Sequence, residues 1–250
     1  MTNLKDTIIV LQARMGSSRL PEKMMIPFFQ GQGVFEILLQ RFVAHYGKEH
    51  VILATTDQPQ DDQLVQVCTD SQVRVYRGSE SDVVERFIGA AGESKHIVRV
   101  CCDNPFLDLN SLDELIAFYF NNTCDYASFQ FSNGRPVIKS HIGVFCEMFT
   151  SEALQRVAAS TDDMLYREHV TNYMYAHPDL FTCAWKALPD YIDGRFDMRF
   201  TLDTLEDFKL LQGLYAEFNG AIELKQLIEF VDSNPSLKDS MQAQIRANEK

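Results

Sequence analysis

One short stretch, residues 7–27, constrains the fold of this chain more than any other. It opens with the uninterrupted aliphatic run Ile8–Leu11, which is typical of a strand covered by helices on both faces, as in a parallel sheet. The run gives way to a polar loop with a Gly-Ser-Ser turn at residues 16–18. Glycine permits close backbone approach, and the serines supply hydroxyl and N–H donors. Its three cations are Arg14, Arg19 and Lys23.

This loop predicts binding of a polyphosphate, because its cations within ten positions meet a single acid, Glu22. The alternative is a solvated loop whose cations pair with an acidic surface. The loop matches neither the P-loop pattern G-x-x-x-x-G-K-[ST] nor the dinucleotide fingerprint G-x-G-x-x-G. The choice between a polyphosphate-binding loop and a solvated loop therefore depends on the rest of the chain.

Strand and helix patterns alternate regularly up to about residue 120. The predicted strands after the first are residues 51–55, 73–76 and 96–102, and the apolar helical faces lie in residues 34–43, 64–68, 83–91 and 112–119. Right-handed crossovers between such units give a doubly wound, Rossmann-like, mostly parallel α/β sheet.

The second half of the chain is less regular. Further strands are predicted at 126–131, 142–149, 181–187 and 199–202, and helices at 151–159, 164–176, 205–214 and 224–231. We expect one domain over 1–250, with a smaller inserted arm or dimerisation subdomain at about 130–190 and a polar C-terminal tail, 234–250, that frays.

Composition narrows the class of ligand. Hydrophobic residues make up 46% of the chain and charged residues 23%, as in globular proteins, while the formal net charge is −12. Nucleic acids and anionic membranes select broad basic patches, so neither is expected as a partner. A local basic loop in an acidic protein suits a small anionic ligand.

The cysteines and apolar runs indicate the compartment. The six cysteines show no C-x-x-C spacing, which argues against a zinc site and a disulfide framework. The first apolar run is too short for a signal peptide, and no run approaches the ~18 residues of a membrane span. We expect a cytoplasmic protein.

Acidic residues follow several predicted strands. In open α/β sheets ligands bind beyond the carboxyl ends of the strands, so the loop should lie beside Asp57, Asp103 and Asp203. Two carboxylates next to a polyphosphate could hold Mg²⁺. The alternative for each aspartate alone is a helix cap or turn residue.

Five stretches, in chain order, resemble motifs of the cytidylyltransferase family, which includes Kdo and acylneuraminate cytidylyltransferases and the SpsF-type spore coat polysaccharide proteins. Gln12–Lys23 resembles Q-A-R-M-G-S-[ST]-R-L-P-G-K, and Arg77–Val83 resembles R-G-S-x-x-D-V. Val98–Pro105 resembles R-V-T-G-D-x-P. Residues 167–171 resemble R-E-H-V-T of the SpsF-type branch, and residues 200–207 resemble the closing V-D-T-P-E-D.

The resemblance implies a nucleotide-diphospho-sugar transferase type of fold and a CTP-dependent reaction. The hydroxyl of a nonulosonic or Kdo-like sugar acid would attack the α-phosphate of CTP, giving a CMP-sugar and pyrophosphate for surface polysaccharide synthesis. Mg²⁺ on Asp103 and Asp203 would lower the pKa of the hydroxyl. The resemblance also implies a homodimer.

Residue roles follow from the matched positions. Arg14, Lys23 and Asp103 are expected to be catalytic. The nucleotide-binding set is Gln12, Ala13, Arg14, Gly16, Ser17, Ser18, Arg19, Lys23, Asp57 and Asp82. The expected sugar contacts are Asn104, His141, Glu147, Arg167 and His169.

Some positions depart from the family pattern. Glu22 and Cys102 stand where glycine is usual. Residues 141–145 resemble H-I-G-I-Y of Kdo cytidylyltransferases, whereas the SpsF-type pattern G-x-D-x-E-v-F places Phe145 where an aspartate is expected; both alignments stay open. Alternative functions are a glycosyltransferase of similar fold, disfavoured because Asn104-Pro105 follows Asp103 instead of D-x-D, and a non-catalytic nucleotide-binding protein.

Overall fold

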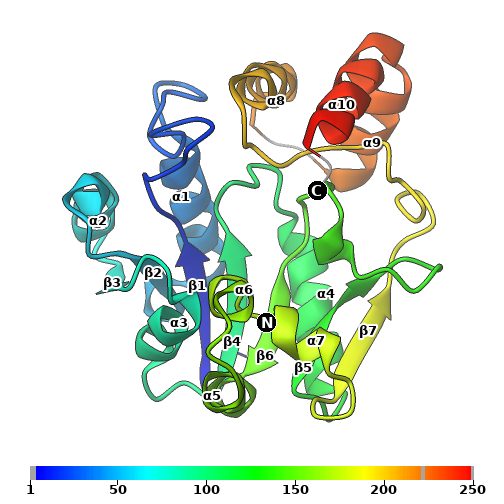
Figure 1. Cartoon of the computed structure of the whole chain (residues 1–250). Helices are drawn as coiled ribbons and strands as arrows, with labels where there is room; N and C mark the ends of the chain where they lie inside the picture. Colours follow the sequence, from blue (N-terminus) through cyan, green and yellow to red (C-terminus); the bar gives the residue numbers. More distant parts are fainter. Residues whose placement is uncertain (1–3, 221–222, 249–250) are drawn as a thin grey trace.

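A seven-stranded sheet runs through the molecule in the computed structural model, which describes residues 4–220 and 223–248 (Figure 1). The strands are β1 (Thr7–Gln12), β2 (Val51–Thr56), β3 (Arg74–Gly78), β4 (His96–Cys101), β5 (Tyr126–Gln130), β6 (Glu147–Thr150) and β7 (Cys183–Ala187). The α-helices are α1 (Val34–Tyr46), α2 (Asp62–Asp70), α3 (Val83–Ala91), α4 (Leu109–Phe120), α5 (Ser151–Ser160), α6 (Met164–Glu168), α7 (Asn172–Ala176), α8 (Leu205–Glu217), α9 (Leu224–Asp232) and α10 (Pro235–Asn248).

The strand order is β3-β2-β1-β4-β6-β5-β7. The first four strands are parallel, with Gln12 of β1 beside Cys101 of β4. β6 runs antiparallel to β4 and β5, and β7 is parallel to β5. The doubly wound, mostly parallel α/β prediction is confirmed. In such a sheet the carboxyl ends of β1, β2 and β4 meet at one edge, where ligands bind.

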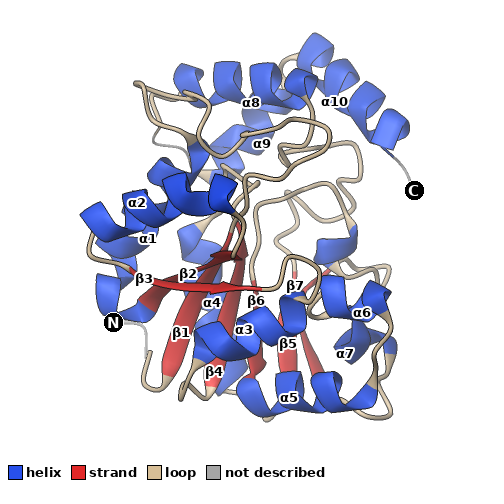
Figure 2. Ribbon diagram, turned by 60° about the vertical axis from the view of Figure 1, so that its left-hand side comes forward, coloured by secondary structure: helices blue, strands red, loops and turns tan. Residues whose placement is uncertain are grey.

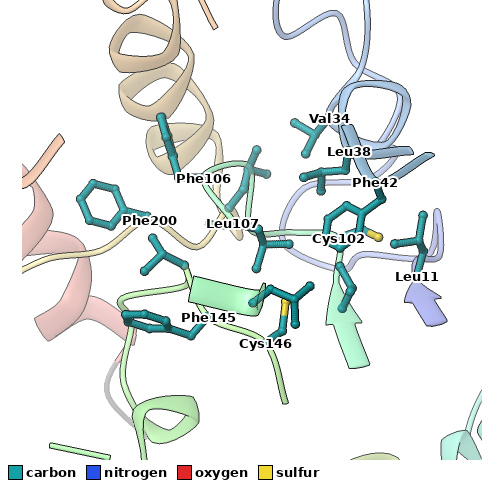
Figure 3. Close-up of a cluster of buried hydrophobic side chains, with 14 of the residues drawn as sticks. Leu11, Val34, Leu38, Phe42, Cys102, Phe106, Leu107, Phe145, Cys146 and Phe200 are labelled. Carbon is teal, nitrogen blue, oxygen red and sulfur yellow. The ribbon is translucent and has the colours of Figure 1, made fainter. Parts of the chain in front are cut away.

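Alternate side chains of β1 feed two apolar layers. Leu11 points to the layer formed with α1 and α4, where it lies near Val34, Phe42 and Cys102 (Figure 3). Val10 points to the opposite layer, formed with α3 and α5. This explains the unbroken aliphatic run at the start of the chain, since both faces of the strand are buried.

Residues 199–202, which lie just before α8, do not form the predicted strand. Phe200 N donates to His141 O and Leu202 N to Asp103 O, so the segment bonds to two loops and not to one continuous strand. Similarly, the predicted strand 142–149 is a strand only from Glu147 onward, where β6 (Glu147–Thr150) begins. The predicted helix 164–176 is two short helices, α6 and α7.

The C-terminal segment is ordered as a helix. Residues 235–248 form α10, so the prediction of a fraying tail from 234 is wrong for this part; residues 249–250 lie outside the described range. Met241 and Ile245 are buried, which anchors the helix by apolar packing. Figures 1 and 2 show α8, α9 and α10 grouped beyond the carboxyl ends of the parallel strands.

The region at about 130–190 contributes β6 and β7 to the same sheet. Its helices α5, α6 and α7 lie on the α3 side of the sheet, where α5 and α6 both contact α3. In the described part of the chain, no helix is long and apolar enough to cross a membrane.

Candidate active site

A cavity of about 430 Å³ opens at the carboxyl ends of β1 and β4. Eleven of the residues predicted from the sequence line it: Gln12, Ala13, Arg14, Gly16, Ser17, Ser18, Arg19, Lys23, Asp103, His169 and Asp203. The lining also includes Arg86, Arg99, Cys101 and Glu168. The loop after β1 thus meets residues from four distant parts of the chain.

Local geometry explains how the loop keeps its shape. Met15 is buried and anchors the loop, and its carbonyl accepts from Ser17 N at 2.9 Å and Glu22 N at 3.2 Å. Glu22 has φ +60°, a conformation that glycine adopts at little cost. This accounts for the glycine usual at that position in the family motif. Glu22 itself is exposed and does not line the cavity.

Cys102, the other departure from the motif, points away from the cavity. It is 1% exposed and packs in the apolar layer with Leu11 and Phe42 (Figure 3). Burial raises the pKa of its thiol well above the ordinary value. Cys102 therefore acts as a small apolar core residue.

Asp61 fixes the loop from behind. Its side chain is fully buried and accepts from Met15 N at 2.7 Å through Oδ1, and from the Thr55 hydroxyl at 2.9 Å and Thr56 N at 3.1 Å through Oδ2. The Thr56 hydroxyl also donates to Oδ2. These bonds link the end of β2 to the start of the loop, so Asp61 positions the loop without lining the cavity.

Replacing Asp61 should cost both stability and nucleotide affinity. We expect Asp61→Ala to lower the free energy of unfolding by about 2–4 kcal/mol, because four buried donors lose their acceptor. Asp62→Ala is the matched control, since its side chain is 65% exposed and pairs with Arg77 at the surface. Urea unfolding of both variants measures the difference; equal losses would contradict this role for Asp61.

Lys23 lies between two carboxylates. Its Nζ donates to Asp103 Oδ2 at 3.4 Å, to Asp203 Oδ1 at 3.3 Å and to the carbonyl of Leu202 at 2.6 Å. Lys23 is 8% exposed. Two carboxylates thus face one cationic centre at the cavity wall, although they come from segments a hundred residues apart in the sequence.

Asp203 is the more strongly held of the two acids. Arg19 Nη2 lies 3.0 Å from its Oδ1, and Arg199 Nη2 donates to its Oδ2 at 3.1 Å. Burial opposes the charged form, but Lys23, Arg19 and Arg199 together lower the pKa of Asp203 below the ordinary value. Asp203 is therefore ionised throughout the neutral range.

The two carboxylates fit a divalent cation. Mg²⁺ commonly takes one or two carboxylates and completes its shell with phosphate oxygens and waters. The described residues contain no cluster of three or more His, Cys, Asp or Glu side chains suited to hold a metal ion alone. A cation between Asp103 and Asp203 would thus depend on further oxygens from a bound ligand.

Arg14 and Arg86 bring positive charge to the far side of the loop. Arg14 Nη1 lies 3.3 Å from Glu80 Oε1, and both side chains are substantially exposed. Arg86 is 2% exposed; its Nη1 donates to Ser79 O at 2.6 Å, while its buried Nε has no hydrogen-bond partner among the residues that the structure describes. Burial, aided by Arg14, lowers the pKa of Arg86.

Glu147, predicted to contact a sugar, lies in a buried network. It is 1% exposed, and its Oε1 accepts from the hydroxyls of Tyr126 at 2.5 Å and Thr171 at 2.8 Å. Its Oε2 accepts from Arg99 Nη1 at 2.7 Å. Glu147 is not among the cavity-lining residues, so its geometry is that of a residue that orients Arg99.

A side pocket of about 250 Å³ adjoins the cavity and shares Cys101, Asp103 and Asp203 with it. Asn104 and His141, both predicted sugar contacts, line this pocket. Arg199 Nη1 lies 2.6 Å from His141 Nδ1. Since a guanidinium can only donate, Nδ1 is the acceptor and the neutral imidazole carries its proton on Nε2. Burial and Arg199 lower the pKa of His141, which favours that neutral form.

Besides Glu147, three predicted residues lie outside both cavities. Asp57 is exposed and accepts from the side chain of Gln58. Asp82 caps α3 by accepting from Glu85 N, and it lies 3.4 Å from Arg167 Nη1. Asp82 and Arg167 therefore join α3 to α6 beside the cavity, and no contact with the cavity supports the prediction that Asp57 binds nucleotide.

Sequence reasoning missed Asp61, Arg86 and Arg99 as residues of the site. Asp61 stands shortly before the apolar helical face at 64–68, and its buried position depends on the packing of β2 against the loop. Arg86 and Arg99 do stand within or next to the family-like motifs at 77–83 and 98–105. Arg86 stands within an apolar helix face and Arg99 within an apolar strand. Those positions could have indicated a functional role, because arginine is rarely buried without a partner.

Comparison with known proteins decides the family. The family model described as cytidylyltransferase matches residues 8–236. The chain belongs to the cytidylyltransferase family. The match includes the loop at Gln12–Lys23 and both Asp103 and Asp203, so the chain is a CTP-dependent nucleotidyltransferase with its loop and paired acids in place.

Relatives of this cytidylyltransferase share nearly its whole length. The spore coat polysaccharide biosynthesis protein SpsF of Bacillus subtilis is 31% identical over 251 residues, covering 96% of this chain and 100% of SpsF. An uncharacterized protein of Methanocaldococcus jannaschii is 34% identical over 233 residues, covering 92% of each chain.

Solved structures share its fold. A cytidylyltransferase from Leptospira borgpetersenii has a TM-score of 0.82 at 27% identity and covers 98% of both chains. A CMP:2-keto-3-deoxy-manno-octonic acid synthetase complexed with CTP has a TM-score of 0.59 at 14% identity, covering 84% of this chain and 98% of that one. This second likeness extends to the fold alone.

Proposed function

We propose that this cytidylyltransferase transfers CMP from CTP to a hydroxyl of a sugar acid, nonulosonic or Kdo-like, and releases pyrophosphate. The observation that carries the proposal is the position of Lys23 Nζ, within 3.4 Å of both Asp103 and Asp203 at the wall of a cavity lined by the phosphate-type loop. SpsF, a relative over its full length, is named for spore coat polysaccharide biosynthesis, which supports a role in surface polysaccharides.

The nucleotide end of the reaction uses the loop. Arg14, Arg19 and Lys23 supply positive charge for the triphosphate, and Ser17 and Ser18 supply hydroxyl donors. Phosphoryl-group transfer depends mainly on positioning and on stabilising charge in the transition state, so these groups would also stabilise departing pyrophosphate. The buried Arg86 would add a further donor on the α3 side of the same cavity.

The acceptor end uses the paired acids. Asp103 and Asp203 would hold Mg²⁺, which when bound lowers the pKa of a hydroxyl and screens phosphate charge. A manganese complex is known for Rv0371c from Mycobacterium tuberculosis, which shares this fold at a TM-score of 0.54. In this chain Lys23 lies between the acids, so it would turn toward the phosphates as the metal binds.

Pyrophosphate release tests the proposal. Purified protein with CTP and Mg²⁺ should release pyrophosphate when given the correct member of a panel of sugar acids. CTP at ~100 times its dissociation constant should add about 2.7 kcal/mol to stability, which is a shift in melting temperature of about 5–10 °C. No CTP-induced shift, together with no release above background across the panel, would refute the proposal. Stabilisation by a UDP-sugar without a response to CTP would favour a glycosyltransferase.

A cytoplasmic location and a homodimer, formed through the region at about 130–190, complete the proposal. On α6, Met164 and Leu165 are 52% and 53% exposed, an apolar surface that supports pairing there. Size-exclusion chromatography with light scattering would measure the oligomeric state directly.

A further inference from the structure

Arg99 is a cavity-lining cation that the proposed triphosphate contacts do not use. It lies on β4, on the same face as Cys101, two residues before it along the strand that leads to Asp103. Arg99 thus lies on the strand that leads to Asp103, whereas Arg14, Arg19 and Lys23 belong to the loop.

The guanidinium of Arg99 is fixed on two edges. Its Nε donates to Gln12 Oε1 at 3.0 Å, and its Nη1 donates to Glu147 Oε2 at 2.7 Å. Glu147 is itself held by the hydroxyls of Tyr126 and Thr171. A side chain locked in this way needs no further ordering when a ligand arrives.

The third edge of Arg99 opens to the cavity. In the part of the chain that the structure describes, Nη2 has no hydrogen-bond partner, and the buried unpaired side-chain atoms are Arg86 Nε and Asn104 Oδ1. Nη2 is thus accessible from the cavity that Arg99 lines. Because Gln12 uses its Oε1 for Arg99, its Nε2 is left as a neighbouring donor.

The side pocket offers no such charge. Its described lining residues include no Lys or Arg, and its His141 is held in the neutral form by Arg199. Its walls include the apolar side chains of Val137, Ile142 and Phe145. An acidic acceptor lying across Asp103 would therefore find a cationic partner on the Arg99 side, and a pocket whose described lining has no cation on the other.

We propose that Arg99, with Gln12 beside it, binds the carboxylate of the acceptor and sets the preference for acidic acceptors. This inference rests on the proposed function, since it assigns the acceptor of that reaction. The uncharged part of the acceptor then extends into the side pocket. Because Nε and Nη1 are already used, Arg99 Nη2 and Gln12 Nε2 would donate to the carboxylate, and a neutral analogue of the same shape loses the charge-assisted bond from Arg99.

The test compares an active sugar acid with its primary amide in pyrophosphate release. Wild-type protein should prefer the acid by about 100-fold in kcat/KM. The double variant Arg99→Met/Glu147→Gln removes both charges of the buried pair, so neither is left unpaired. It should reduce the preference to below about 5-fold by raising KM for the acid, while KM for CTP and the CTP-induced thermal shift stay unchanged.

A matched control is the Arg156–Asp125 pair, which joins α5 to the segment before β5 at 2.8 Å and does not line the cavity. The variant Arg156→Met/Asp125→Asn should keep the wild-type preference. An acid-to-amide ratio that is unchanged in the Arg99 double variant would overturn the inference and leave the proposed reaction standing. Turnover of no sugar acid, by a protein that binds CTP, would overturn both.

Discussion

Lys23→Ala should lower kcat for pyrophosphate release by at least about 100-fold, the effect of removing one donor that stabilises transition-state charge. Lys23 is the one loop cation in the described cavity that reaches both acids, through contacts of 3.4 Å to Asp103 and 3.3 Å to Asp203. The variant also removes the 2.6 Å bond to the carbonyl of Leu202, so its folding must be verified by urea unfolding and circular dichroism.

Two comparisons make the Lys23 prediction specific. Lys225→Ala is the control, because Lys225 is 63% exposed and only pairs with Glu229 on α9. Lys23→Arg keeps the charge but not the compact ammonium, and it should recover only part of the activity. A folded Lys23→Ala protein with activity within about threefold of wild type would contradict the role given to Lys23.

Asp203→Asn should have the second large effect, a loss of about 100-fold in activity at low millimolar Mg²⁺. The amide keeps the shape of the side chain but removes the charge that faces Lys23, Arg19 and Arg199. Part of the loss should be recovered as Mg²⁺ is raised, because a weaker ligand set increases the dissociation constant for the metal. The measurement is pyrophosphate release over a Mg²⁺ titration.

We also expect Asp203→Asn to change how the stability of the protein depends on pH in the acid range. Since the pKa of Asp203 is lowered in the folded protein, its stabilising contribution is present above the ordinary carboxyl pKa and is lost as pH falls through the lowered value. The variant should therefore lose stability at neutral pH and show a smaller further loss in acid. Asp239→Asn, at an exposed position on α10, is the control for acid stability.

For the activity prediction, a Mg²⁺ titration of Asp203→Asn identical to that of wild type would argue against Asp203 as a metal ligand.

The loop at Gln12–Lys23 and the acids that follow it could be predicted because their signals are local or topological. A buried aliphatic run fixed β1, and the rule that parallel strands end at one edge brought Asp103 beside the loop. Asp203 also lies at the cavity, as expected, although the strand predicted before it does not form. The side chain of Arg199 binds Asp203 and Asp207 instead, and the backbone of residues 200–202 bonds to two loops.

Long-range packing accounts for what the sequence did not predict. Glu147 resembled a ligand-binding acid, but the pairing of β6 with β4 places it beside Arg99, where Tyr126 and Thr171 bind its other oxygen. The polar C-terminal segment lacked a strong apolar pattern, yet Met241 and Ile245 suffice to bury one side of α10. Neither outcome depends on neighbours in the sequence.

The link between Lys23 and Leu202 spans 179 residues, and Arg19 Nη1 donates to Asn248 Oδ1 across 229 residues at 2.8 Å. Contacts of such sequence separation carry a large loop-closure cost and form late during folding. During synthesis, the walls of the cavity are complete only after Asp203 has left the ribosome, long after the loop itself. Competence to bind CTP is thus acquired only after all seven strands of the described sheet have been made, and removal of the chain from Leu202 onward should abolish it although every one of those strands is kept.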